Sequence, residues 1–379
     1  MANLTRDDRE IIGGITQISG ATSNPTTATD DVIDLISINF VLAGSGSGLI
    51  DGLGGLDELR LNSVDLRDVV IQGIETTTLS GVNLNTIEAD QLGNLGTLGF
   101  TEGYTPGNTF IDGRLRLDYT GVVGLTTLGT TGIGPIGDDL RIEFSQLGQV
   151  AGQQVVGDFS GIVRGTVNSL FSYVGAQADE TITGTAGDDS IEASSGTNDV
   201  DGGAGNDTLR ASSGVSTLLG GAGDDSVVGS GLSGLLAGGA GDDTITQSTG
   251  RFDSGAYVAV EISGGADNDD ISVGSVQGAG STVRGDAGDD TIRLSSVTMV
   301  NGTVDGGTGT DLLEVQSSNL TGTDFSGIEA TTILNNGFVT LDASEFVDLG
   351  TVTFTDTFPT LGQTIDDANI QLSFAGGAA

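Results

Sequence analysis

The sequence contains no cysteine, histidine, lysine or tryptophan, and only 4 of its 379 residues are proline. Without cysteine there are no disulfide bonds, no thiolate metal ligands and no cysteine nucleophile. Without histidine, a serine hydrolase lacks its usual general base, and the His-Glu-x-x-His zinc motif is absent. We therefore expect a non-enzymatic protein with no catalytic residues and no organic cofactor. The enzymatic alternative is a polysaccharide enzyme that works with two carboxylates, but few arginines are available to hold acidic sugars.

Basic residues are also scarce, with 12 against 52 acidic residues and a formal net charge of −40. A nucleic-acid-binding protein needs a basic patch to release counterions, so we expect no nucleic-acid partner. No apolar run approaches the ~20 residues that cross a bilayer, so we expect no membrane insertion, and the N-terminus lacks the pattern of an ordinary signal peptide. Self-repulsion at this charge opposes compaction. Either bound cations support the fold, or the acidic residues form a solvated surface of the halophilic kind.

Glycine is the abundant residue, with 65 copies, and 36% of the residues are hydrophobic. The glycines have no three-residue period, which excludes collagen, and the hydrophobic content is too high for a disordered polymer. Threonine, valine, isoleucine and leucine recur in short alternating runs. This pattern predicts an all-β protein.

Residues 184–313 contain seven copies of a six-residue loop that begins with glycine and ends with aspartate. The copies span residues 184–189, 202–207, 220–225, 238–243, 264–269, 285–290 and 306–311. An aliphatic residue follows each loop by two positions, and from the second loop on another precedes it by two, as inward side chains on short strands would. Each repeat is then one coil of a right-handed parallel β-helix or β-roll, with coils ~4.8 Å apart.

The composition of the loops suits calcium, which takes 6–8 oxygen ligands from carboxylates and backbone carbonyls. Glycine lets the backbone turn tightly and point its carbonyls at an ion, while aspartate reaches the ion from the loop. Two loops one coil apart can share an ion, so seven loops offer up to six Ca²⁺ sites. The gap between Asp243 and Asp269 is the least regular. The alternative is that the aspartates only cap glycine-rich turns. The return segments carry few carboxylates, so we expect the metal ladder along one edge only.

The loops resemble the G-G-x-G-x-D-x-U-x nonapeptide of the repeats-in-toxin (RTX) calcium-binding family. The resemblance implies that the sixth-position aspartates are the main side-chain ligands: Asp189, Asp207, Asp225, Asp243, Asp269, Asp290 and Asp311. The further candidates at the fourth and fifth positions are Gly187, Gly205, Gly223, Gly241, Gly288, Asp188, Asn206, Asp224, Asp242, Asp267 and Asp289. The resemblance also implies type I secretion through an uncleaved C-terminal signal, for which residues 366–374 are a candidate.

The remaining sequence divides into further segments around the calcium-binding β-roll, which we place at residues 179–315. The others are an N-terminal arm (1–43) with a short helix (5–12) and a possible assembly strand (32–42), N-terminal β-helical coils (44–95), a smaller antiparallel β insertion or sandwich (96–178), and C-terminal β-helical coils with the secretion signal (316–379). The antiparallel assignment follows from period-two alternation in residues 115–119 and 140–144.

A second repeat relates residues 57–92 to residues 311–346. In both, a Gly-Ile-Glu sequence follows an aspartate, with the isoleucine seventeen residues after Asp57 or Asp311. This shared frame predicts related β-helical coils on both sides of the central region.

These features predict a secreted, extracellular protein of the cell surface that self-associates into a surface layer, filament or matrix. Coils with an Ile-Glu-x-Thr sequence also resemble those of bacterial surface-layer proteins. The alternative is a calcium-dependent adhesin that binds a cell-surface polysaccharide, with Tyr104, Tyr119, Tyr173 and Tyr257 as a candidate stacking platform. In either case we expect the calcium-free roll to unfold, because stacked carboxylates repel one another.

Overall fold

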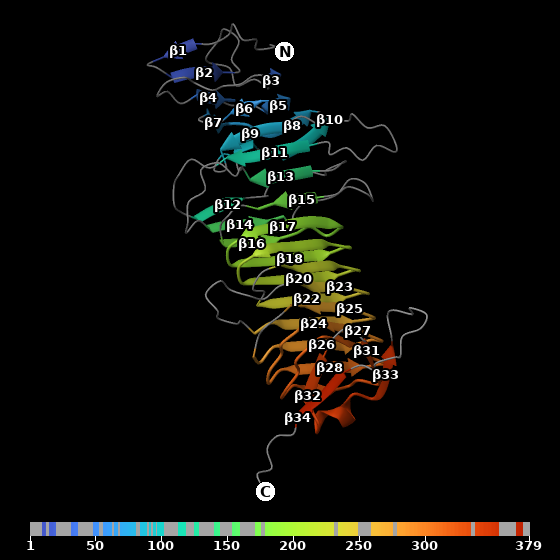
Figure 1. Ribbon diagram of the computed structural model, residues 1–379. Helices are drawn as coiled ribbons and strands as arrows, with labels where there is room; N and C mark the ends of the chain where they lie inside the picture. Colours follow the sequence, from blue (N-terminus) through green and yellow to red (C-terminus); the bar gives the residue numbers. More distant parts are fainter. Residues whose placement is uncertain are drawn as a thin grey trace, which may run out of the picture. The chain divides into compact units, whose positions relative to one another are not determined.

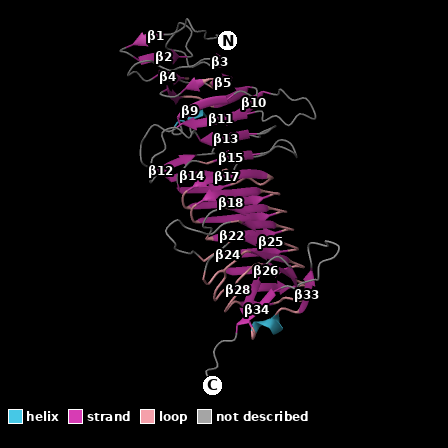
Figure 2. Ribbon diagram, viewed as in Figure 1, coloured by secondary structure: helices cyan, strands magenta, loops and turns pink. Residues whose placement is uncertain are grey.

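The structure is a computed structural model, and nearly all of its described elements are β-strands (Figure 2). It describes residues 10–12, 15–19, 32–36, 48–52, 56–62, 64–66, 69–80, 84–88, 91, 94–95, 97–101, 113–118, 125–128, 140–144, 154–159, 171–175, 179–230, 234–248, 259–275, 279–334, 338–355 and 369–373. These residues belong to two compact units, the N-terminal unit Met1–Ile191 and the C-terminal unit Glu192–Ala379. The division falls inside the segment in which we predicted the roll.

The C-terminal unit is a parallel β-solenoid in which each coil gives one strand to each of two long sheets (Figure 1). The first sheet contains β19 (Thr208–Ser213), β21 (Ser226–Gly229), β23 (Thr244–Gln247), β25 (Asp270–Gly274), β27 (Thr291–Ser295), β29 (Leu312–Gln316), β31 (Ala330–Leu334) and β33 (Thr351–Thr355). The second contains β18 (Asn198–Ala204), β20 (Ser216–Ala222), β22 (Leu235–Ala240), β24 (Glu261–Ala266), β26 (Thr282–Ala287), β28 (Thr303–Thr308) and β30 (Asp324–Ser326). The predicted parallel solenoid is therefore confirmed.

The core of this unit is made of aliphatic columns, one along each sheet, as predicted from the residues that flank the loops. The residues of the first column are Leu209, Val227, Ile245, Ile271, Ile292 and Leu313, and those of the second are Val200, Leu218, Leu236, Ile262, Val283 and Val304. Each is almost fully buried and lies opposite its equivalent in the next coil. Burial of one such side chain contributes about 1.5–3 kcal/mol, so the columns are the main apolar stabilisation of the stack.

The later coils are wider than the earlier ones because their return segments form a third short side. Thr298 and Asn319 are joined there by an isolated parallel bridge, as are Asn319 and Thr340. Val297 and Met299 are buried beneath this side. The extra length of the later repeats thus lies on the edge opposite the loops. In the longest interval between two loops, residues 249–258 lie outside the described residues.

The end of the C-terminal unit carries a 3-10 helix, η2 (Glu345–Asp348), and a parallel pair formed by β32 (Phe338–Asp342) and β34 (Asn369–Ser373). Across the described residues of the whole chain, no helix is long and apolar enough to span a bilayer.

The N-terminal unit is also built from parallel strands. Its strands are β2 (Ile15–Ser19), β3 (Val32–Ile36), β4 (Gly48–Asp51), β5 (Glu58–Asn62), β6 (Asp65–Leu66), β7 (Val69–Gln72), β8 (Thr76–Ser80), β9 (Leu84–Glu88), β10 (Thr97–Thr101), β11 (Gly113–Asp118), β12 (Leu125–Leu128), β13 (Leu140–Phe144), β14 (Gln154–Asp158), β15 (Phe171–Val174) and β16 (Asp179–Thr183). A further strand, β1 (Glu10–Ile12), pairs antiparallel with β2. The strand β17 (Asp189–Ser195) contains the division between the units.

The prediction of an antiparallel region at residues 96–178 is wrong for the strands that the structure describes there. The strand β13 pairs in parallel with both β11 and β15, and β14 pairs in parallel with β12. A solenoid strand has one face toward the core and one toward solvent, so it shows the same period-two alternation as an antiparallel strand. Leu115 and Ile142 are accordingly buried in neighbouring coils.

The predicted helix at residues 5–12 is also wrong over its described part, because residues 10–12 form β1. Period alone does not distinguish a short apolar run in a helix from one in a strand. The strand predicted at residues 32–42 is found as β3 over its described part.

Candidate metal centre

Each glycine–aspartate loop leads from a strand of the second sheet to a strand of the first, as between β20 and β21. From the second loop on, the second and fourth loop positions have a backbone φ in the left-handed region, which glycine adopts without a steric penalty. The loops also stack closely: a methyl group on Gly221 (φ +115) would come within 3.0 Å of the carbonyl oxygen of Gly203 in the preceding coil. The fifth and sixth loops place Asp267 (φ 76) and Asp286 (φ 73) in the same conformation.

We expect Gly221→Ala to destabilise the calcium-loaded protein by about 3 kcal/mol or more, since the new side chain meets a rigid carbonyl in an unfavourable conformation. Gly274→Ala is the matched control, because the nearest atoms to its added methyl group are 3.8 Å away and its φ is not in the left-handed region. Denaturant unfolding of both variants in saturating calcium measures the difference. Equal midpoints would contradict the loop stacking.

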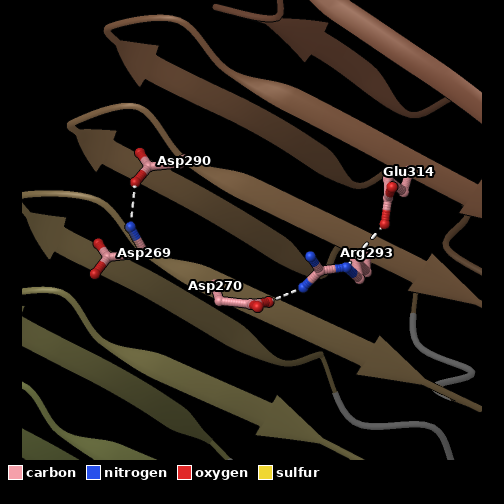
Figure 3. A network of polar contacts seen from close by, with 5 residues as sticks. All are labelled: Asp269, Asp270, Asp290, Arg293 and Glu314. Atoms are coloured by element: carbon pink, nitrogen blue, oxygen red, sulfur yellow. Dashed lines mark hydrogen bonds and ion pairs between the residues drawn. The ribbon is translucent and has the colours of Figure 1, made fainter.

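The sixth-position aspartates form a continuous ladder along the inside of the loops. The Oδ1 atoms of five of them accept the backbone N–H of the equivalent aspartate one coil earlier, at 2.7 to 2.9 Å. These acceptors are Asp225, Asp243, Asp269, Asp290 and Asp311. Figure 3 shows the carboxylate of Asp290 directed at the backbone nitrogen of Asp269. The gap that we expected to be least regular, between Asp243 and Asp269, is closed by the same bond at 2.8 Å.

In four aspartates of the ladder, the second carboxylate oxygen has no hydrogen bond within the part of the chain that the structure describes. Among the described residues, the buried Oδ2 atoms of Asp243, Asp269, Asp290 and Asp311 have no hydrogen-bond partner. Each lies against the first glycine of its own loop, where a methyl group would displace it. A desolvated carboxylate oxygen without a partner costs at least about 1–3 kcal/mol, which a cation beside these four oxygens would offset.

A backbone carbonyl of the next coil shares this space. An added methyl group on Gly264 would lie within 3.0 Å of Asp269 Oδ2 and 2.5 Å from the carbonyl oxygen of Gly285. Carboxylate and carbonyl oxygens are the ligands that calcium prefers, so these residues fit the predicted ion. The described residues contain no group of three or more acidic side chains that could hold a metal. In the predicted sites, backbone carbonyl oxygens would therefore supply ligands beside the aspartates.

Burial changes the protonation of the ladder. It raises the pKa of Asp243 and Asp290 to about 6 and that of Asp269 to about 7, and neighbouring carboxylates add to the rise while the backbone N–H bonds oppose it. Burial also raises the pKa of Asp311. Without a cation, the folded ladder therefore holds protons that free aspartates would release. Bound calcium would instead hold the ionised form.

The fifth-position residues form a second ladder on the outside of the loops. Here each side chain accepts the N–H of the equivalent residue one coil later, whereas the sixth-position side chains accept from one coil earlier. Asn206 Oδ1 accepts the N–H of Asp224 at 3.1 Å, and Asp224 Oδ1 accepts that of Asp242 at 3.0 Å. The fifth-position candidates are all exposed, namely Asp188, Asn206, Asp224, Asp242 and Asp289, and so is Asp267 at the fourth position of its loop. The structure thus brings the sixth-position candidates together in a buried column and places those of the fifth position at the surface.

Sequence reasoning missed the residues at the two ends of the loops. In the first loop, Asp189 accepts hydrogen bonds from the backbone N–H and the hydroxyl of Thr185, which stands where most loops have a second glycine. After the seventh loop, Glu329 Oε2 accepts the N–H of Asp311 at 2.8 Å. The Gly-Ile-Glu frame shared by residues 57–92 and 311–346 was the sequence signal for Glu329.

Arg293 pairs with acidic residues of two neighbouring coils on the first sheet. Arg293 on β27 contacts Asp270 on β25, and its Nε lies 2.8 Å from Glu314 Oε2 on β29 (Figure 3). One side chain thus connects three successive coils. Its half-exposed ion pairs contribute about 0–1 kcal/mol each, so they do not replace a cation in the ladder.

The family model of the RTX calcium-binding nonapeptide repeat (4 copies) matches residues 174–209, 201–235 and 278–296. The matched segments contain the loops at 184–189, 202–207, 220–225 and 285–290. The other three loops lie outside the match but have the same aspartate ladder. Comparisons with curated proteins and with solved structures found no match.

Proposed function

This chain carries calcium-binding repeats of the RTX family, and from that premise we propose that it is a secreted structural protein which calcium folds and assembles into a surface layer, filament or extracellular matrix. Proteins with these repeats are typically secreted or extracellular. The proposal includes no catalytic activity, since the chain has no histidine, lysine or cysteine for acid–base or nucleophilic chemistry.

The observation that carries the proposal is the unbroken parallel stack of the C-terminal unit, in which buried aspartates repeat once per coil. The calcium-poor interior of the cell leaves these carboxylates without a positive partner, so the roll stays unfolded and can be exported. A calcium-rich exterior supplies the partner and closes the stack. The repeated unit is a scaffold rather than a pocket, which suits a structural role.

The last coils also support self-association. Among the described strands, β33 is the last of the first sheet, and the edge strand of a sheet offers N–H and C=O groups to a neighbour. Phe354 on this strand, Phe338 on β32 and Val347 on η2 are exposed large apolar residues. A second copy of the chain that paired with this edge would also cover apolar surface.

The adhesin alternative receives less support. Tyr173, one of the four tyrosines of the suggested sugar platform, is fully buried and donates a hydrogen bond to Glu180 at 2.9 Å. Its ring packs against Phe159, with the centroids 5.9 Å apart. Tyr173 is therefore part of the core, and the other three tyrosines lie outside the described residues.

Electron microscopy of purified protein after calcium addition tests the proposal. We expect ordered sheets or filaments in calcium, and dispersed particles in magnesium at the same ionic strength. Deletion of residues 1–43, the predicted assembly arm, should block polymers while leaving calcium-induced folding intact. Dispersed folded particles in calcium at all concentrations would refute the structural role and favour an adhesin.

A further inference from the structure

The aspartate ladder of the C-terminal unit ends in a glutamate that sits in register with the loops. The N–H of Asp311 donates to Glu329 Oε2 at 2.8 Å, just as the N–H of Asp290 donates to Asp311 Oδ1 at 2.9 Å. The next backbone bond also matches, because Ala330 N donates to the Asp311 carbonyl at 3.1 Å as Leu312 N does to the Asp290 carbonyl at 2.8 Å. The turn at residues 327–329 therefore takes the place of an eighth loop, although it lacks the loop sequence.

The oxygen atoms of a loop-to-loop gap are also present beneath this turn. A methyl group on Gly306 would lie within 3.0 Å of the carbonyl oxygen of Gly327 and 2.7 Å from Asp311 Oδ2. In the preceding gap, the equivalent neighbours of Gly285 are the Gly306 carbonyl and Asp290 Oδ2. Asp311 is only 1% exposed, and its Oδ2, directed into this gap, has no hydrogen-bond partner among the described residues.

The N-terminal unit contains the same arrangement. The N–H of Asp57 donates to Glu75 Oε2 at 2.7 Å, and an added methyl group on Gly52 would lie 2.7 Å from Asp57 Oδ2. The same methyl group would come within 3.0 Å of the carbonyl oxygen of Gly73, the counterpart of Gly327.

The coil that follows is also the same in both places. Thr77 Oγ1 donates to the Leu95 carbonyl at 2.6 Å, as Thr331 Oγ1 does to the Leu349 carbonyl at 2.7 Å. Because the same contacts occur at two places in the chain, the Gly-Ile-Glu turn is a recurring structural module.

We propose that each Gly-Ile-Glu turn forms a mixed aspartate–glutamate calcium site with the loop before it, at Asp311 and Glu329 in the C-terminal unit and at Asp57 and Glu75 in the N-terminal unit. These sites add to the loop-to-loop sites, and the inference rests on the proposed calcium-dependent function. A cap for the Asp311 N–H needs only one neutral acceptor, which glutamine would provide. A second carboxylate beside the buried Asp311 adds repulsion, which a divalent cation between them offsets.

The variant Glu329→Gln separates a site from a cap, because the amide oxygen still accepts the Asp311 N–H while the charge is lost. We expect native mass spectrometry and equilibrium dialysis to find one calcium ion fewer per chain than in the wild type. The circular dichroism spectrum in saturating calcium should be unchanged. Asp348→Asn, an exposed carboxylate on η2, is the control and should keep the wild-type count.

An unchanged calcium count in folded Glu329→Gln would overturn the inference and leave the turn as a cap only. A wild-type protein that bound no calcium would instead refute the proposed function itself. If Glu329→Gln did not reach the wild-type spectrum in calcium, Glu75→Gln decides the same question, because it leaves the ladder of the C-terminal unit intact. Loss of one ion in that variant supports the module, and an unchanged count contradicts it.

Discussion

Removal of calcium at neutral pH is expected to unfold the β-roll of the C-terminal unit. The Oδ2 atoms of Asp243, Asp269, Asp290 and Asp311 are buried with no hydrogen-bond partner among the described residues, and ionising the ladder without a cation places one negative charge in each coil. A bound ligand at a hundredfold excess over its Kd stabilises a fold by about 2.7 kcal/mol per site. Several such sites together match the ~5–15 kcal/mol that holds a typical domain. Far-UV circular dichroism of protein freed of calcium on a chelating resin should show loss of the β spectrum, and a calcium titration should restore it cooperatively.

Two controls separate a specific site from general charge screening. Magnesium at equal ionic strength should restore little structure, because it demands near-ideal octahedral geometry and dehydrates reluctantly. Concentrated sodium chloride screens the −40 charge without filling a site. Full recovery of the spectrum in sodium chloride alone would support the halophilic explanation of the acidic residues. An unchanged spectrum after calcium removal would defeat the coupling of metal to folding.

The stacked coils and their core could be predicted because period and spacing report them directly. Seven aspartates in one frame, each with an aliphatic residue two positions later, place Ile245 and Ile271 in one column even though the repeat lengthens between them. The direction of the strands at residues 96–178 could not be predicted in this way. A half-buried strand alternates identically in parallel and antiparallel sheets, so the pattern in residues 140–144 carried no information on its partner.

The chemistry of the ladder was only partly visible in the sequence. The aspartates were predicted to be ligands, but the hydrogen bond from the N–H of Asp269 to one oxygen of Asp290 depends on how the coils stack. The two ends were harder still. Thr185 stands where most loops have glycine, and its side chain bonds to Asp189. Glu329 resembles the many other acidic residues in the sequence, and its contact with Asp311 is visible only in the folded chain. Contacts between residues of different coils depend on the register of the neighbouring strands, and the local sequence does not determine that register.

Replacement of Asp269 by asparagine is expected to stabilise the calcium-free fold and to weaken calcium-induced folding. Burial raises the pKa of Asp269 from its ordinary 3.8 to about 7 in the folded chain. Between these values the calcium-free folded roll binds a proton that the unfolded chain has released. Its contribution to stability is therefore present at low pH and is lost as the pH rises through 7. Calcium-free wild type should accordingly fold near pH 5 and unfold as the pH rises through about 6 to 7.

Asparagine is neutral at every pH in this range and keeps an oxygen that can accept the Asp243 N–H. Calcium-free Asp269→Asn should therefore stay folded to a higher pH than the wild type, with a gain of about 1–3 kcal/mol above pH 7, since one pKa unit represents about 1.4 kcal/mol. In calcium the same variant lacks a ligand, and the concentration for half-maximal folding should rise about tenfold, the equivalent of about 1.4 kcal/mol. Circular dichroism against pH and against calcium measures both. Asp199→Asn, which changes an exposed acid on β18, should shift neither transition. If Asp269→Asn changed stability in the same direction with and without calcium, Asp269 would not exchange a buried proton for a bound ion.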